Sequence, residues 1–504
     1  MDTDLQSIQQ VRTLCEKAYN TLPQLRALTQ RQVDTVVEAM VEEGYRAARS
    51  LAEMAVQETG FGVVADKTIK NEVATRQVWD YIKSLKTVGV INTSPDKSVL
   101  EIAEPVGVIA GIIPVTNPTS TALFKAIIAI KSRNAVVFSP HPRAVKCTTA
   151  SVELMQKVLA QHKLPREALG MITSPTMKAT EELMHHKYIA LILATGGTAM
   201  VKSAYSSGKP AYGVGPGNVP AFIERTADVD KAIADIMVSK VFDNGTVCAS
   251  EQSIIVDEPI YQRVVEQFKA HKAYLLNAQQ TERVSQALVR PGLQINPKLV
   301  GQPAHVIAEA AGFPVPADTS LLVAELDGVG RDYPLSIEKL SPVLAMYRVN
   351  GWEAGCERCI ELLKFGGIGH TLAIHSSNHD IIMEFALEKP AYRIVVNTPA
   401  THGAIGATTN LAPSLTLGCG TFGGNSTSDN IGPQHLINIK RLAFEVRPLH
   451  APSGAKSSAI KRKKLVTEKD VREALGSGKK IKLERDCIVT PAARELARGK
   501  DILE

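Results

Sequence analysis

The chain has 504 residues, of which 44% are hydrophobic and 21% charged. This apolar content exceeds what one small core needs, so two or more domains of an ordinary soluble protein are expected. No stretch approaches the roughly 18 unbroken apolar residues of a membrane span. The acidic, polar start MDTDLQSIQQ also lacks the basic and apolar regions of a secretory signal. We therefore expect a cytoplasmic protein with no membrane partner.

The formal net charge of +6 comes from the end of the chain. Residues 451–504 contain 14 Lys and Arg and 8 Asp and Glu, so the rest of the chain is neutral. A neutral body lacks the basic footprint of a nucleic-acid-binding protein, and no nucleic-acid partner is expected. The seven cysteines do not suggest a disulfide framework. The CxxC of Cys356 and Cys359 has no second pair that would complete a zinc site, so no metal is expected.

The first 87 residues are expected to be helical, because apolar side chains recur there at intervals of three and four, beginning with Leu5, Ile8 and Val11. Residues 88–105 follow as two β-branched runs around a turn-like Ser-Pro-Asp. This pattern predicts a β-hairpin.

Between residues 106 and 240, short apolar runs alternate with helical segments. Strands that alternate with helices predict a mostly parallel sheet, covered on both faces, in an α/β fold. Each run ends in polar or glycine residues, and ligands of such sheets bind beyond the carboxyl ends of the strands. Residues 241–429 repeat this alternation of short apolar runs and helical segments, and residues 430–447 are expected to be extended.

Residues 451–504 are expected to form a linker and a tail. The linker APSGAKSSAIKRKK is rich in Pro, Gly and Ser and then basic, which favours a solvated connection over a binding patch. A small helix–strand–helix unit is expected to follow it.

The strongest chemical signal is Cys248, which follows a turn-forming Asn-Gly and is flanked by small residues. This setting would let a substrate carbonyl approach a thiolate closely. Taken alone, a single cysteine is more often a small buried apolar residue. A nucleophilic role for Cys248 therefore needs support from other motifs.

Two further motifs occur where expected strands meet helices. Asn117, in the run IIPVTNPT, could donate its amide to a developing oxyanion, or it could simply cap the helix that begins at Pro118. The two interpretations are compatible. The turn Thr195-Gly196-Gly197-Thr198 would let a phosphate approach backbone N–H groups, although it lacks the full glycine pattern of a dinucleotide fingerprint.

In order and context these motifs resemble the aldehyde dehydrogenase superfamily over about residues 1–447. The nucleophile motif NGTVCASEQS, the strand end IIPVTNPT, the TGGT turn and Glu338 in EKLSPVL follow that family's order. The segments FSPHPRA, GVGPGNVP, GIGHTLAIHS and TLGCGTFGGNS are similar to its coenzyme-A-acylating branch. Each motif alone is weak, but their combination is highly specific.

The resemblance implies an α/β aldehyde dehydrogenase fold in three parts. A Rossmann-like NAD-binding domain would comprise residues 1–87 and 106–240, and an α/β catalytic domain residues 241–429. A β extension from residues 88–105 and 430–447 would mediate oligomer contacts, giving a homodimer or homotetramer.

The resemblance also implies the roles of individual residues. Cys248 would be the nucleophile and Asn117 the oxyanion donor. His370 could accept the thiol proton of coenzyme A, or it could be a structural histidine satisfied by hydrogen bonds. Glu338 would contact a ribose of NAD, and the rest of the NAD site would comprise Pro114, Ser139, Pro140, Thr195, Gly196, Gly197 and Gly215.

One departure from the family pattern points to the reaction. Hydrolytic members carry a glutamate upstream of the cysteine that activates water, but residues 212–220 contain no carboxylate. Without a positioned base, attack of water on the thioester should lose about two to four decades of rate. A thioester that resists water can wait for the thiol of coenzyme A. A second departure, Ser139 in place of a lysine, leaves the choice between NAD and NADP open.

These observations predict an enzyme that oxidises acetaldehyde or propionaldehyde with NAD and coenzyme A, reversibly, through a Cys248 thioester. A hydrolytic aldehyde dehydrogenase and a non-catalytic cargo or scaffold protein are the alternatives. The tail resembles segments appended to proteins of bacterial microcompartments. It could dock on shell or cargo proteins, which would place the enzyme inside a microcompartment of the bacterial cytoplasm.

Overall fold

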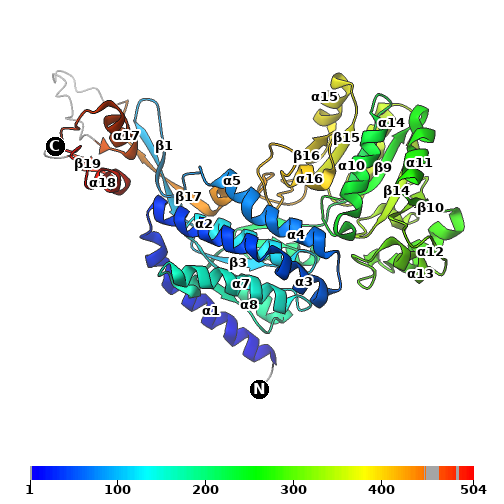
Figure 1. Ribbon diagram of the computed structural model, residues 1–504, viewed down its shortest axis with the longest axis horizontal. Coiled ribbons are helices and arrows are strands. Elements are labelled where there is room, and N and C mark those ends of the chain that lie inside the picture. The colour runs from blue at the N-terminus through cyan, green and yellow to red at the C-terminus, as the bar shows by residue number, and fades with distance from the viewer. Residues whose placement is uncertain (1–2, 448, 450–464, 484–486) are drawn as a thin grey trace.

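The computed structural model describes residues 3–447, 449, 465–483 and 487–504 (Figure 1). Two parallel sheets, a three-stranded antiparallel sheet and a small C-terminal unit make up its architecture. Within the part of the chain so described, no helix is long and apolar enough to cross a membrane. The linker expected at 451–464 lies outside the described residues.

The N-terminal segment is helical, as its apolar spacing predicts. Thr29 caps the second helix reciprocally: its side chain accepts from the N–H of Gln32, whose side chain accepts from the N–H of Thr29. The elements of this segment are α1 Thr3–Arg26, α2 Gln30–Arg46, α3 Ala48–Thr59, α4 Val64–Glu72, the π-helical η1 Val73–Gln77 and α5 Val78–Ile82.

The first parallel sheet has five strands in the order β5 (Leu169–Met171), β4 (Ala135–Ser139), β3 (Val108–Ile112), β6 (Ile189–Thr195) and β7 (Ala211–Val214). Strands β3 and β4 are buried along their whole length, which explains why their sequences are unbroken apolar runs. The strand order reverses between β3 and β6, so a ligand-binding crevice is expected beyond the carboxyl ends of these two strands. The connecting helices are α6 Pro118–Lys131, α7 Val145–Gln161, α8 Met177–His185 and α9 Thr198–Ser206, with the 3₁₀ turn η2 Arg166–Ala168.

The second sheet has seven parallel strands in the order β10 (Ala273–Leu275), β13 (Leu321–Glu325), β14 (Val343–Val349), β9 (Glu251–Asp257), β8 (Val219–Ile223), β15 (Gly369–His375) and β16 (Ala391–Val396). Its helices are α10 Val229–Val241, α11 Tyr261–Ala270, α12 Ala278–Leu288, α13 Ala304–Ala310, α14 Trp352–Phe365, α15 His379–Glu388 and α16 Ala400–Ala404. The smaller elements are the hairpin β11 Val289–Arg290 and β12 Gln294–Ile295, and the 3₁₀ turns η3 Phe242–Gly245, η4 Glu258–Ile260, η5 Pro334–Ser336 and η6 Pro433–Leu436.

The connection between the two sheets determines where chemistry can take place. The chain leaves the carboxyl end of β7 at Val214 and enters the amino end of β8 at Val219. The carboxyl edge of the first sheet therefore meets the amino edge of the second. Strand β8 already belongs to the second sheet, although the domain division expected from sequence falls later, at residue 240.

The hairpin expected at residues 88–105 is confirmed as β1 (Gly89–Thr93) and β2 (Val99–Pro105), which pair antiparallel. Strand β17 (Ile437–Ala443), from the segment expected to be extended, pairs antiparallel with β2 and forms one edge of this sheet. Its apolar side chains are largely exposed.

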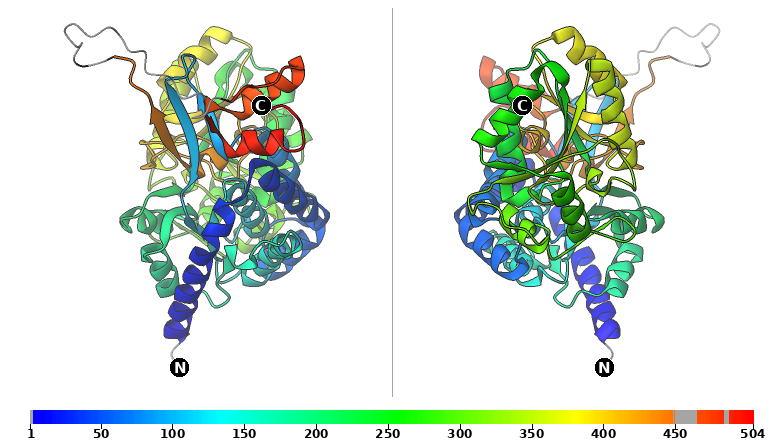
Figure 2. Two further views of the ribbon diagram at one scale, coloured as in Figure 1. Left: turned by 90° about the vertical axis from the view of Figure 1, so that its left-hand side faces the viewer. Right: turned by 90° about the vertical axis from the view of Figure 1, so that its right-hand side faces the viewer.

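The C-terminal unit folds around a small core of its own beside the β1–β2 hairpin (Figures 1 and 2). Two short parallel strands, β18 (Leu465–Val466) and β19 (Ile488–Val489), alternate with helices α17 (Glu468–Ser477) and α18 (Pro491–Ala497). The sequence predicted the helices and the second strand but not β18. The buried apolar residues of this core are Val466, Val471, Ala474, Ala493, Ala497 and Ile502.

Candidate active site

Asn117 lies between the end of β3 and the first residue of α6. The helix begins with proline at its first position, as expected, but the Asn117 side chain makes no capping hydrogen bond. Its Oδ1 instead accepts from Lys70 Nζ at 2.7 Å, and its Nδ2 lies 3.1 Å from Thr116 Oγ1. The Asn117 side chain therefore does not cap α6.

The loop that carries Cys248 turns sharply after α10. Asp243, Asn244 and Gly245 are consecutive residues in the left-handed region, with φ of 52°, 51° and 75°. Gly245 is required there, because a Cβ would lie 2.8 Å from the backbone oxygen of Ser341. This turn leads into the segment before β9 and leaves Cys248 partly exposed.

The Cys248 thiol is protonated at neutral pH in this structure. Desolvation raises its pKa to about 12, the Glu338 carboxylate and Cys419 act in the same direction, and Arg393 opposes them. Because the thiolate is the nucleophile, catalysis requires a change in this environment or a base that removes the proton.

Glu338 and His370 lie on either side of Gly217, in the connection between the two sheets. The Gly217 N–H donates to Glu338 Oε1 at 2.9 Å. A Cβ on Gly217 would lie 2.1 Å from the Cys248 carbonyl oxygen and 3.1 Å from the His370 ring. Only glycine fits here, and its backbone brings the glutamate, the cysteine and the histidine together. Desolvation raises the pKa of Glu338 to about 7.

His370 is the second residue of strand β15 and is fully buried. Its Nδ1 lies 2.9 Å from Thr371 Oγ1, and its Nε2 has no hydrogen-bond partner among the described residues. Burial lowers its pKa to about 3, with a smaller contribution from Arg393, so the ring is neutral at physiological pH. A neutral imidazole with a free nitrogen can accept a proton, but a pKa this far below neutral makes it a weak base until its surroundings change.

The segment from 212 to 220 contains no carboxylate that could act as a water-activating base, and Gly213 within it is tightly packed. A Cβ on Gly213 would lie 2.7 Å from Val201 Cγ1 and 3.1 Å from the Tyr205 ring. The Tyr205 hydroxyl donates to the Gly213 carbonyl at 3.1 Å and accepts from its N–H at 2.9 Å. A glutamate at this position would have to displace both packing partners.

Apart from Glu338, which precedes β14 of the second sheet, the residues expected to bind NAD lie at or just beyond the carboxyl ends of first-sheet strands. Ser139 ends β4, and its hydroxyl is buried 2.9 Å from Thr180 Oγ1. Thr195 ends β6, and its Oγ1 is buried without a partner among the described residues. The other expected positions follow β3, β4, β6 or β7 in the chain: Pro114, Pro140, Gly196, Gly197 and Gly215.

These positions suit a dinucleotide. Space next to Gly197 and Gly215 is open, since no atom lies within 4 Å of a Cβ built at either position. Gly197 is also the N-cap of α9, where backbone N–H groups can receive a phosphate. The unpartnered Thr195 hydroxyl adds a polar group. Across the described ranges, no cluster of three or more His, Cys, Asp or Glu side chains could hold a metal ion.

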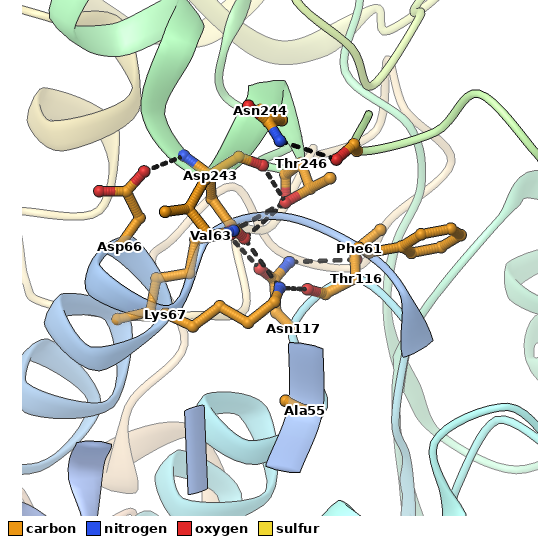
Figure 3. A network of polar contacts seen from close by, with 12 residues as sticks. Ala55, Phe61, Val63, Asp66, Lys67, Thr116, Asn117, Asp243, Asn244 and Thr246 are labelled. Atoms are coloured by element: carbon orange, nitrogen blue, oxygen red, sulfur yellow. Dashed lines mark hydrogen bonds and ion pairs between the residues drawn. The ribbon is translucent and has the colours of Figure 1, made fainter. Parts of the chain in front are cut away.

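Four residues near the site were not singled out from sequence: Lys67, Lys70, Asp243 and Arg393. Lys67 and Lys70 contact the buried carboxylate of Asp243, and Figure 3 shows Lys67 beside it. Arg393 is buried beside Cys419 and donates to the Gly418 carbonyl and to the Ser428 carbonyl, the latter at 3.0 Å. The i, i+3 spacing of two lysines on one helix is the signal that could have drawn attention to the first pair.

Comparison with known proteins identifies the family. Residues 2–287 match the model of the aldehyde dehydrogenase family. The bifunctional aldehyde-alcohol dehydrogenase AdhE of Escherichia coli K12 is 44% identical over 442 residues, which cover 87% of this chain. The chain spans about half the length of that relative, since the match covers 50% of it.

Solved structures resemble nearly the whole fold. An acetylating aldehyde dehydrogenase from Geobacillus thermoglucosidasius is 52% identical with a TM-score of 0.88, covering 89% of this chain and 99% of that one. A propionaldehyde dehydrogenase from the fucose utilisation bacterial microcompartment of Clostridium phytofermentans is 26% identical with a TM-score of 0.78, covering 86% and 97%.

Proposed function

The chain belongs to the aldehyde dehydrogenase family, and from that premise we propose that it oxidises acetaldehyde or propionaldehyde with NAD and transfers the acyl group to coenzyme A. The carboxylate-free segment 212–220 carries this proposal, because it offers no glutamate that could activate water for attack on the thioester. The similarity to an acetylating aldehyde dehydrogenase supports it.

The reaction begins when the Cys248 thiol loses its proton to solvent water, and the thiolate then attacks the aldehyde carbon. The Glu338 carboxylate is one of the groups that raise the thiol pKa. Hydrogen bonds from ribose hydroxyls to Glu338 would draw part of its negative charge away from the thiol and so weaken its contribution to the thiol pKa. Asn117 Nδ2 and neighbouring backbone N–H groups would then hold the oxyanion that forms on the former carbonyl oxygen.

When bound, NAD accepts the hydride that leaves the tetrahedral adduct. The site residues then keep the acyl thioester on Cys248 until coenzyme A arrives. His370, neutral and with a free Nε2, would accept the proton of the incoming thiol. The coenzyme A sulfur attacks the thioester carbon and Cys248 leaves as thiolate. Each step can run backwards, so the enzyme can also reduce an acyl-CoA.

Hydrolysis to a free acid is the alternative within the same fold. One observation favours it: Glu338 lies close enough to raise the Cys248 pKa, and its own pKa of about 7 suits a general base. Glu338 also accepts a hydrogen bond from the Gly217 N–H, and the family resemblance implies that it contacts a ribose of NAD. Both points favour a role in cofactor binding over a role as general base.

Product identification separates these reactions. We expect acyl-CoA as the product at saturating coenzyme A, and only a burst of about one NADH per site without it, because hydrolysis should be slower by about two to four decades. Mass spectrometry of the products measures this. Free acid as the main product, with preformed acyl-CoA shown to survive the incubation, would exclude the acylating function. Absence of any NADH would favour a non-catalytic scaffold protein.

The β extension supports an oligomer, which we propose to be a homodimer or homotetramer. Strand β17 is an edge strand, and Ile439, Leu442 and Phe444 in and after it are 41%, 43% and 51% exposed. An edge strand with exposed apolar side chains is suited to pairing with another chain.

We further propose that the C-terminal unit directs the enzyme into a bacterial microcompartment through shell or cargo proteins. The similarity to an aldehyde dehydrogenase of such a compartment supports this. The unit has its own core and touches the body through exposed polar groups, including Lys97 with Asp470 at 3.8 Å and Thr29 with Glu495 at 3.4 Å. Contacts of this kind contribute little to stability.

Removal of the C-terminal unit tests its role. A chain that ends at Arg447 should keep its turnover, thermal stability and oligomer size, because the unit packs mainly on itself. It should lose co-purification with shell proteins. Continued co-purification would place the targeting signal elsewhere, and a loss of turnover would show that the unit serves the active site.

A further inference from the structure

Helix α4 carries two buried lysines that reach the nucleophile loop. Figure 3 shows the first of them, Lys67, with Asp243. Lys67 and Lys70 are 2% and 4% exposed, and both ammonium groups contact the carboxylate of fully buried Asp243. The Lys67 contact is 2.9 Å long. Asp66, partly exposed on the same helix, adds a second negative charge and accepts from the Asp243 N–H at 2.7 Å. Buried charges are tolerated only when they are paired and hydrogen-bonded in this way.

Asp243 is the centre of the network. Its Oδ1 accepts from the Val63 N–H at 2.7 Å, and its Oδ2 accepts from Thr246 Oγ1 at 2.6 Å as well as from the two lysines. Burial alone would raise the pKa of Asp243, but the two ammonium groups lower it overall. The carboxylate is therefore ionised and ties the turn before Cys248 to helix α4.

Lys70 determines which way the Asn117 amide faces. An ammonium group can only donate, so the Asn117 atom that lies 2.7 Å from Lys70 Nζ must be the amide oxygen. The amide nitrogen then points to the other side. One of its two hydrogens is directed at Thr116 Oγ1, and the second remains for a ligand. If the amide were reversed, its NH₂ group would face the ammonium and the hydrogen bond from Lys70 would be lost.

The same ammonium reaches the nucleophile loop. Lys70 Nζ lies 3.4 Å from both the carbonyl oxygen and the Oγ1 of Thr246, two residues before Cys248. Lys67 differs in this respect: besides Asp243, it contacts the backbone carbonyl of Thr116 at 2.7 Å and neither the Asn117 side chain nor Thr246. The two lysines thus share burial and a counter-ion but not their other contacts.

We propose that Lys70 is a positioning residue, which orients the Asn117 amide toward the oxyanion and fixes its distance from the loop of Cys248. This role rests on the proposed function, in which Asn117 stabilises the oxyanion. Lys70 acts through Asn117 and does not touch the substrate. Loss of Lys70 should therefore impair the step that forms the tetrahedral adduct and leave aldehyde binding nearly unchanged.

A double-mutant cycle with Lys70→Met and Asn117→Ala tests the proposal, with thermal unfolding measured for each variant. Loss of a single oxyanion donor lowers kcat about 10²- to 10³-fold, and we expect a loss of that order for Asn117→Ala and up to that order for Lys70→Met, with KM within about threefold. Adding Lys70→Met to Asn117→Ala should cost no more than about twofold further, because the group that Lys70 positions is already gone.

Lys67→Met is the matched control, because it removes an equally buried ammonium from the same carboxylate. We expect it to cost less than about tenfold in kcat while lowering the unfolding temperature as much as Lys70→Met does. Lys70→Gln covers the case in which Lys70→Met does not fold. Its amide can still donate to Asn117, so kcat should stay within about tenfold of the unmodified enzyme.

The outcomes distinguish a failure of the positioning role of Lys70 from a failure of the proposed mechanism. Fully multiplicative losses in the double variant, or equal losses of kcat for Lys67→Met and Lys70→Met, would overturn the positioning role and leave a purely structural network. Unchanged kcat in Asn117→Ala would instead remove the oxyanion role of Asn117, and with it the basis of the proposed mechanism, whatever Lys70 does.

Discussion

Replacement of Cys248 with alanine should lower NADH formation from a short aldehyde to background, a loss of roughly five to six orders of magnitude. The physical reason is that the covalent adduct cannot form. The Asn117 amide stabilises an oxyanion only after a nucleophile has attacked, so it offers little catalysis by itself. The measurement is NADH absorbance with acetaldehyde, NAD and coenzyme A, together with mass spectrometry for an acyl group on the protein.

Two other cysteines provide controls for this variant. Cys147 is buried, with its Sγ 3.6 Å from the Ala144 carbonyl, and its replacement with alanine should leave turnover within about threefold. Cys419 is a stricter control, because its thiol is close enough to raise the Cys248 pKa. Cys419→Ala should also keep most activity. A Cys248→Ala enzyme with near-normal turnover, or a Cys419→Ala enzyme without any, would show that the nucleophile has been misassigned.

Features of the chain that depend on local sequence were predictable. The strands β3 and β4 are unbroken apolar runs because both of their faces are buried, and the β1–β2 hairpin follows from β-branched residues around a turn. The family order of its motifs pointed to Cys248, Asn117 and Glu338. The structure adds the contacts of these residues, through Gly217 and through Lys70.

Features that depend on distant contacts could not be predicted in this way. Lys70 and Asp243 are 173 residues apart in the chain, and nothing next to either residue indicates that they meet. The state of His370 depends on its complete burial, which a sequence motif does not specify. The strand β18 has only two residues, too few for an alternating pattern to be recognised.

His370→Gln should separate the two halves of the reaction. Formation of the acyl enzyme does not use the imidazole, so the first burst of NADH should keep its amplitude of about one per site. Transfer to coenzyme A should slow by about 10²- to 10⁴-fold, the range for loss of a general base. Rapid mixing of the enzyme with aldehyde and NAD, followed by addition of coenzyme A, measures the two steps in turn.

His375→Gln is the matched control for this prediction. His375 lies at the other end of the same strand, is buried, has an Nε2 without a partner among the described residues, and has a pKa lowered by burial to about 4. Its replacement removes a histidine of the same kind at a distance from the proposed site, so both steps should proceed at nearly normal rates. If His370→Gln slows both steps equally and His375→Gln does the same, His370 is a structural residue.

The pH dependence of the transfer step gives an independent test. Since burial lowers the pKa of His370 to about 3, the neutral, proton-accepting form persists as the pH falls and would be lost only near pH 3. An ordinary histidine would instead lose its basic form below about pH 6.5. Coenzyme A transfer from preformed acyl enzyme should therefore show no histidine-dependent decline between pH 7 and about pH 5. A tenfold loss per pH unit below 6.5, absent in His370→Gln, would mean that His370 titrates normally while the acyl enzyme is formed.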